Sequence, residues 1–161
     1  MPMKFNFAIA GMLTLLTTFV HGQDNGITVI HPWSRATAAT GQVGVAFLVM
    51  SNANDIDDAL TSVRSEDADS TEIHATSMDD KGVMHMDQVK QVSIPAHGKV
   101  EFKPEGYHIM LMGLKRPLRK GERVPITLEF YRAGSLRVEA VVLAPDAMGP
   151  NEAIDEQSKG K

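Results

Sequence analysis

The sequence predicts an all-β domain, a sandwich or a barrel, and three observations support that prediction. Short runs of alternating apolar and polar residues recur along the chain, as expected for strands with one buried face. Clusters of Gly, Pro, Asn and Asp separate these runs at intervals of about 8–12 residues, the usual spacing of strands in sandwiches and barrels. No segment has a convincing amphipathic helical pattern.

Ten segments have the composition and alternation of strands. In order along the chain they are 27–37, 43–52, 59–65, 70–78, 82–89, 91–95, 99–104, 107–114, 124–131 and 135–143. The breaks between them include NANDIDD, DDKG, PAHGK, KPEGY and RKGE, all rich in residues that favour turns. The last two segments are joined by residues 132–135 (RAGS), and we expect them to form a hairpin.

The chain divides into three predicted parts. Residues 1–22 place Lys4 before an apolar run, the pattern of a secretory signal peptide cleaved after Gly22. That run has about 16 residues, short for the alternative of a membrane anchor, which needs about 20. Residues 23–144 are expected to form the β domain. Residues 145–161 contain few large apolar residues and are expected to form a flexible tail.

Charge and cysteine content exclude several functions. The net charge of −4 argues against nucleic acid or an anionic membrane surface as the main partner. The chain has no cysteine, which excludes thioredoxin-like redox sites, thiolate zinc sites and blue-copper sites. An exported chain without disulfides must be stabilised by its core alone.

Methionine and histidine gather in two of the predicted regions. Methionines stand at 78, 84, 86, 110 and 112, interleaved with His74, His85 and His108. In the strand GYHIMLMGL, residues two apart share a face, so His108, Met110 and Met112 lie together and Ile109 and Leu111 face the other way. Thioether and imidazole together suit Cu(I), and a thioether in an oxidising compartment cannot be lost to a disulfide.

The alternative is that these methionines fill the core, the commoner role of a Met-rich strand. Other histidines need no metal: His31 reads as a strand residue, His97 as a turn residue, and His21 leaves with the signal peptide. The acidic stretches NDIDD and SEDADS lack the spacing of a calcium loop. The residue pattern alone leaves the choice between core and ligand open.

A resemblance to a known family bears on that choice. From Trp33 to Val142 the sequence resembles the PCuAC family of periplasmic copper chaperones, whose signature is a His, ten intervening residues, a Met, twenty-one more and then H-x-M. His108-Ile109-Met110 supplies the last element, Met86 lies twenty-one intervening residues before it, and His74 is the first His. The segments HPWSRATAATGQVGVAFLVMSN and GYHIMLMGLKRPLRKGERVPITLEF also resemble the family.

The chain departs from this signature at one place. Eleven residues rather than ten lie between His74 and Met86, so the strict count from His74 falls on His85. The second interval holds only from Met86, and the turn DDKG can absorb one extra residue. Met84 shares the predicted face of Met86 while His85 takes the other. Met84 and His85 remain open as substitute ligands.

The resemblance implies a cupredoxin-like Greek-key β-sandwich and one Cu(I) ion near the surface, held by His74, Met86, His108 and Met110. Met112 would shield the site or act as a reserve ligand, and Cu(II) binding is left open. Family members are understood to help supply copper to the binuclear copper centre of cytochrome c oxidase subunit II, often beside a Sco-type thiol protein. By analogy we expect a monomeric periplasmic protein that transfers copper to that subunit by ligand exchange.

Two rival functions remain. The chain could buffer periplasmic copper for tolerance, which would require capacity for more than one ion, and a tail with only Met148 gives little support for it. It could also be a metal-free sandwich for adhesion, in which replacing Met86 and Met110 by Leu would alter packing alone. No G-x-S-x-G elbow, P-loop or dinucleotide motif is present, so no enzymatic turnover is expected. A copper-dependent oxidase is a more distant alternative.

Overall fold

The computed structural model describes residues 25–150 and contains ten strands in that range. Each of the ten predicted segments overlaps one of these strands. The strands are β1 (Ile27–Arg35), β2 (Gly44–Asn52), β3 (Asp58–Arg64), β4 (Ala68–Met78), β5 (Met84–Gln88), β6 (Val92–Ile94), β7 (Lys99–Phe102), β8 (Tyr107–Leu114), β9 (Arg123–Phe130) and β10 (Gly134–Leu143). The predicted signal peptide, 1–22, lies outside the described residues. Within residues 25–150 no helix has the length and apolar character needed to cross a membrane.

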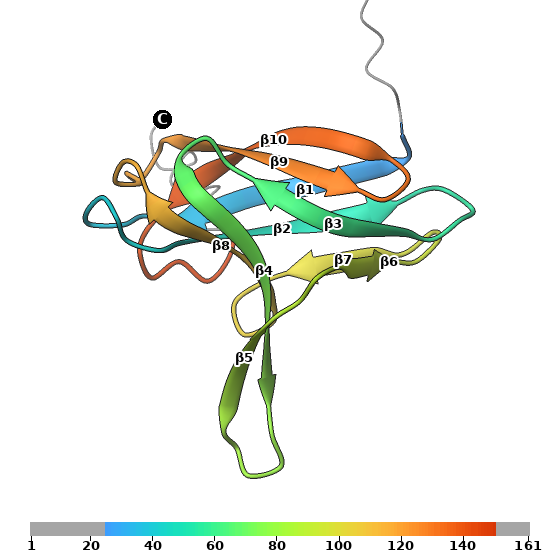
Figure 1. The fold of residues 1–161 in the computed structure, drawn as a ribbon, viewed down its shortest axis with the longest axis horizontal. Helices are drawn as coiled ribbons and strands as arrows, with labels where there is room; N and C mark the ends of the chain where they lie inside the picture. The colour runs from blue at the N-terminus through green and yellow to red at the C-terminus, as the bar shows by residue number, and fades with distance from the viewer. Residues whose placement is uncertain (1–24, 151–161) are drawn as a thin grey trace, which may run out of the picture.

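The strands form one continuous sheet that folds over on itself into a sandwich (Figure 1). Its order is β5-β4-β8-β7-β2-β1-β10-β9-β3-β6. Strand β1 joins the two halves, because it pairs antiparallel with β2 and parallel with β10. The predicted hairpin is present: β9 and β10 pair antiparallel, with Phe130 opposite Gly134. The prediction of an all-β sandwich is confirmed, and the cupredoxin-like expectation agrees with this topology.

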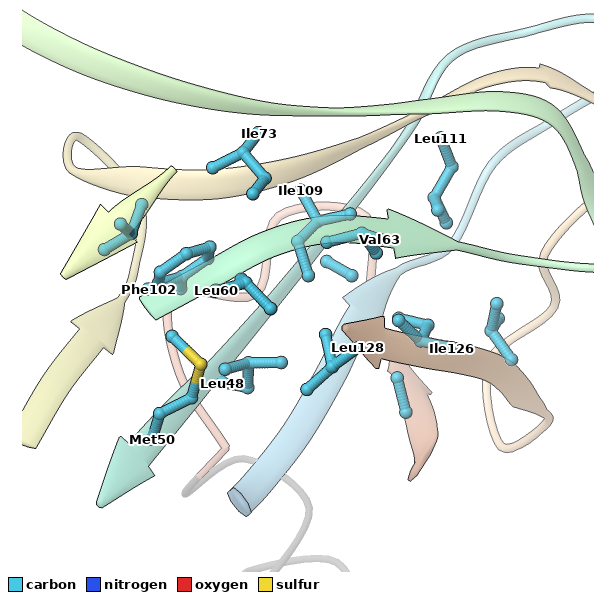
Figure 2. Close-up of a cluster of buried hydrophobic side chains, with 14 of the residues drawn as sticks. Leu48, Met50, Leu60, Val63, Ile73, Phe102, Ile109, Leu111, Ile126 and Leu128 are labelled. Atoms are coloured by element: carbon cyan, nitrogen blue, oxygen red, sulfur yellow. The ribbon is translucent and has the colours of Figure 1, made fainter. Parts of the chain in front are cut away.

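The main core lies between the two halves of the folded sheet. Strands β2 and β8 contribute Leu48, Ile109 and Leu111, and β3 and β9 contribute Leu60 and Leu128 from the opposite side (Figure 2). These side chains come from alternate positions, which is why the sequence pattern identified their strands. Burial of branched aliphatic side chains is the main stabilising contribution in a chain without disulfides.

A second, smaller cluster covers the outer face of β1 and β2. A bulge at His31-Pro32 shifts the register between Ile30 and Trp33, and His31 adopts a positive φ of 47°. After the bulge the Trp33 ring packs against Phe47, with the ring centroids 4.5 Å apart. His31 therefore lies in a strand, as predicted, and His97 lies in the turn before β7.

The prediction of a flexible tail beginning at residue 145 is wrong for the first few residues, because the chain packs against the sheet at Ala147. Ala147 is 1% exposed and packs in the second cluster with Trp33, Phe47 and Leu143. The backbone N–H of Ala147 donates to the Ala144 carbonyl, which turns the chain back onto the sheet. The sequence missed this docking because one small apolar residue gives no periodic signal. The rest of the predicted tail, 151–161, lies outside the described residues.

The β4–β5 hairpin projects from the sandwich (Figure 1). Every residue of β5 is exposed, so this strand contributes nothing to the core. Its turn is closed by Asp79, whose carboxylate accepts the backbone N–H groups of Lys81 and Val83 at 2.9 Å. The hydrogen bond from the His85 side chain, followed by these backbone N–H groups, holds the pKa of Asp79 below its usual value.

Candidate metal centre

Strand β8 divides its side chains between the core and the outer face. Ile109 and Leu111 are fully buried in the core, as the alternation predicts. His108, Met110 and Met112 occupy the alternate positions; His108 is 5% exposed and the two methionines are half-buried. His108 and Met110 are therefore neighbours on the face that the main core does not use.

The adjacent strand β4 brings His74 to the same face. His74 lies directly opposite His108 in the register, and the ring centroids are 5.8 Å apart. Its Nε2 donates a hydrogen bond of 2.7 Å to the Glu72 carboxylate, while its Nδ1 is buried and has no hydrogen-bond partner. A buried imidazole lone pair without a donor is expensive to leave unsatisfied, and a bound metal ion would satisfy it.

His108 is oriented by the turn between β7 and β8. Its Nδ1 donates to the Gly106 carbonyl at 3.0 Å, and the same carbonyl accepts the backbone N–H of Thr76 at 3.1 Å. Because Nδ1 carries the proton in this arrangement, neutral His108 presents the lone pair of Nε2. A backbone carbonyl on the other ring nitrogen is a common way for proteins to fix the tautomer of a ligating histidine.

Strand β5 brings Met86 to this face. Met86 lies opposite Thr76 in the register, and Thr76 alternates with His74 along β4, so all three side chains project to one side. The Met86 side chain is 56% exposed. It is therefore not a core residue, which removes the main alternative to a ligand role for it.

The two substitute ligands considered from the sequence are placed differently. His85 lies opposite Ser77, on the other face of the hairpin, and its Nε2 is 3.0 Å from an Asp79 carboxylate oxygen. Met84 shares the face of Met86 but lies opposite Met78, one step closer to the hairpin tip.

A surface cavity of about 380 Å³ brings three of the four predicted ligands together. Met86, His108 and Met110 contribute to its wall, and the remaining lining consists of Arg35, Val45, Phe47, Thr76, Pro104, Glu105 and Met148. His74 is not in the lining but lies beside His108. The lining also omits Met84, His85 and Met112.

Sequence reasoning missed two residues at this cavity, Arg35 and Met148. Arg35 ends β1, and its Nη2 donates to the Met148 sulfur at 3.2 Å. The two residues are 113 positions apart in the sequence, and neither belongs to a spacing pattern. Arg35 and Met148 come together because residues 144–148 dock on the sheet, and no local sequence pattern predicts that docking.

The donor set limits the chemistry of this cavity. Among residues 25–150, no three His, Cys, Asp or Glu side chains gather into a potential metal site. The predicted ligands His74, Met86, His108 and Met110 would hold a metal ion through imidazole together with thioether. That neutral, soft donor set suits Cu(I) and suits calcium or magnesium poorly.

The family profile described as "Putative lipoprotein LpqE-like" matches residues 27–142. The chain belongs to this LpqE-like family. A curated relative, "Putative lipoprotein Lxx21020" from Leifsonia xyli subsp. xyli, is 33% identical over 131 residues, which are 81% of this chain and 76% of the relative. The match to the LpqE-like family spans all ten strands except the last residue of β10.

Solved PCuAC domains have the same fold. The copper-bound PCuAC domain from PmoF2 is 26% identical, with a TM-score of 0.63, and the match covers 74% of this chain and 94% of that domain. Cu(I)-bound DR1885 from Deinococcus radiodurans is 30% identical, with a TM-score of 0.56, over 74% of this chain and 80% of that protein. The resemblance to the PCuAC family drawn from the sequence is thereby confirmed.

Proposed function

We propose that this chain binds one Cu(I) ion as cargo and transfers it to an acceptor protein. The observation that carries the proposal is the cavity shared by Met86, His108 and Met110, with His74 beside it. His74 would bind through Nδ1 and His108 through Nε2, the nitrogens that their hydrogen bonds leave available. The copper-bound PCuAC domains of the same fold support the choice of metal.

The neutral donor set favours carriage over permanent retention. Imidazole and thioether carry no charge to compensate that of the ion, so binding is expected to be weaker than at thiolates. The cavity wall also contains the Arg35 guanidinium and the Glu105 carboxylate, so these two charged side chains together add no net charge that would retain a cation. An acceptor can therefore replace the thioethers one at a time at a site that is open to the surface. No catalytic turnover is part of this proposal.

We propose that transfer takes place in the periplasm, and that the acceptor is the binuclear copper centre of cytochrome c oxidase subunit II, with a Sco-type thiol protein as a further partner. The family resemblance supports this acceptor. Export is supported by the predicted signal peptide and by the lipoprotein names of the family and the relative. These 161 residues contain no cysteine that could carry a thiol-linked lipid.

The proposal can be tested by direct transfer. Protein loaded anaerobically with one equivalent of Cu(I) is mixed with the metal-free copper domain of subunit II, and copper on the acceptor is measured after separation. A parallel sample keeps the two proteins on opposite sides of a dialysis membrane. We expect transfer that is faster on direct contact. Retention of the ion together with uptake of further equivalents would contradict transfer and favour copper buffering.

A further inference from the structure

The segment after β10 is fixed against the sheet beside the cavity. Ala147 is buried with Trp33 and Leu143 in the second cluster, and residues 144–147 form a turn closed by a backbone hydrogen bond. The next residue, Met148, lies in the cavity wall with Met86, His108 and Met110. A buried anchor therefore positions a methionine of the predicted tail at the candidate copper site.

Arg35 contacts this segment through two hydrogen bonds. Its Nε donates to the Ala147 carbonyl at 2.8 Å, and its Nη2 donates to the Met148 sulfur at 3.2 Å. The guanidinium carbon lies 5.6 Å from the centroid of the Phe47 ring, a cation–π arrangement. The three contacts fix the direction of Arg35, and the hydrogen bond to the sulfur holds the Met148 thioether at the cavity wall.

The Met148 side chain is largely exposed. It is 62% exposed although the residue before it is buried. Methionine has three rotatable side-chain bonds and adapts to irregular sites, so its sulfur can move within the cavity without a change in the backbone. A thioether beside two others and an imidazole has the soft character of the rest of the donor set.

We propose that Met148 is an additional sulfur ligand of the copper ion, supplied to the cavity by the C-terminal segment and positioned by Arg35. This inference rests on the proposed Cu(I) function. In the metal-free protein the sulfur accepts a hydrogen bond from Arg35, and in the loaded protein the same lone pair binds the ion. Loading thus breaks the contact between Arg35 and the sulfur, and release of the ion restores it. The exchange gives the thioether a partner in both states.

The test compares Met148→Leu with wild-type protein, using Met78→Leu as the matched control. Both substitutions remove an exposed thioether at nearly constant volume, but Met78 does not line the cavity. Cu(I) affinity is measured by anaerobic competition with a chromophoric chelator, and the Met148 ε-methyl resonance is followed by NMR during loading of the wild type. We expect Met148→Leu to weaken Cu(I) binding by about tenfold. We also expect Met78→Leu to match the wild type, and the Met148 methyl resonance to shift with the first equivalent.

The ligand role requires both results. An unmoved Met148 methyl overturns it even if the affinity falls, since the loss would then come from altered packing of residues 144–148. An unchanged affinity of Met148→Leu overturns it even if the methyl shifts, since that shift would report proximity alone. If wild-type protein retains no Cu(I), the proposed function fails as well, whereas tight binding that is indifferent to Met148 removes only this inference.

Discussion

His74 and His108 lie directly opposite each other on β4 and β8, with their ring centroids 5.8 Å apart. Each ring has one nitrogen committed to a hydrogen bond, His74 to the Glu72 carboxylate and His108 to the Gly106 carbonyl. The remaining nitrogens are available to a metal ion. The two strands thus present a pair of histidines of fixed orientation, to which the more mobile thioethers can be added.

Glu72 is expected to act through His74. Its carboxylate accepts the Nε2–H of His74, which orients the ring and leaves Nδ1 without the proton. We predict that Glu72→Ala weakens Cu(I) binding by about tenfold, measured by chelator competition. Glu101→Ala is the control, because Glu101 is an exposed residue of β7 that pairs with Lys103. Equal affinities of Glu72→Ala and wild type would exclude this role.

The choice among Met84, His85 and Met86 can be tested by single substitutions. We predict that Met86→Leu weakens Cu(I) binding by at least about tenfold, because its thioether lines the cavity. His85→Ala is expected to leave the affinity unchanged, since this side chain lies on the other face of the hairpin. Met84→Leu is expected to have a small effect. A large loss in His85→Ala with none in Met86→Leu would restore the strict count from His74.

Stability and copper binding should separate along β8. Ile109 is fully buried, and we predict that Ile109→Ala lowers the free energy of unfolding by about 2–5 kcal/mol in urea denaturation. Met110→Leu conserves volume at the half-buried neighbouring position and should cost less than about 1.5 kcal/mol. Among molecules that remain folded, the order for Cu(I) affinity should be the opposite. Met110→Leu should weaken Cu(I) binding more than Ile109→Ala does. Comparable destabilisation by both variants would mean that Met110 is a core residue.

The strands were predictable because their signals are local. Alternation placed Ile109 and Leu111 in the core, and Gly, Pro, Asn and Asp marked the turns between the ten segments. Alternation also put Met84 and Met86 on one face and His85 on the other, and the register with β4 confirms that arrangement. Periodicity alone could not decide which of the two methionines lies at the cavity.

Features that depend on distant parts of the chain could not be predicted in this way. The hydrogen bond of Arg35 to the Met148 sulfur joins residues 113 positions apart. It exists because Ala147 fits against Trp33 and Phe47, and a single alanine in a polar segment gives no hydrophobic pattern. The orphaned Nδ1 of His74 likewise follows from its contact with Glu72 and from burial, neither of which the residue spacing reports.

The most direct test of the central claim is an anaerobic Cu(I) competition titration against a chromophoric chelator. Wild-type protein is compared with the double variant Met86→Leu/Met110→Leu, and circular dichroism verifies that both are folded. We predict that the wild type retains one tightly held equivalent and that the double variant loses it. No retention by the wild type, or equal retention by both proteins, would contradict the assignment of these methionines as copper ligands.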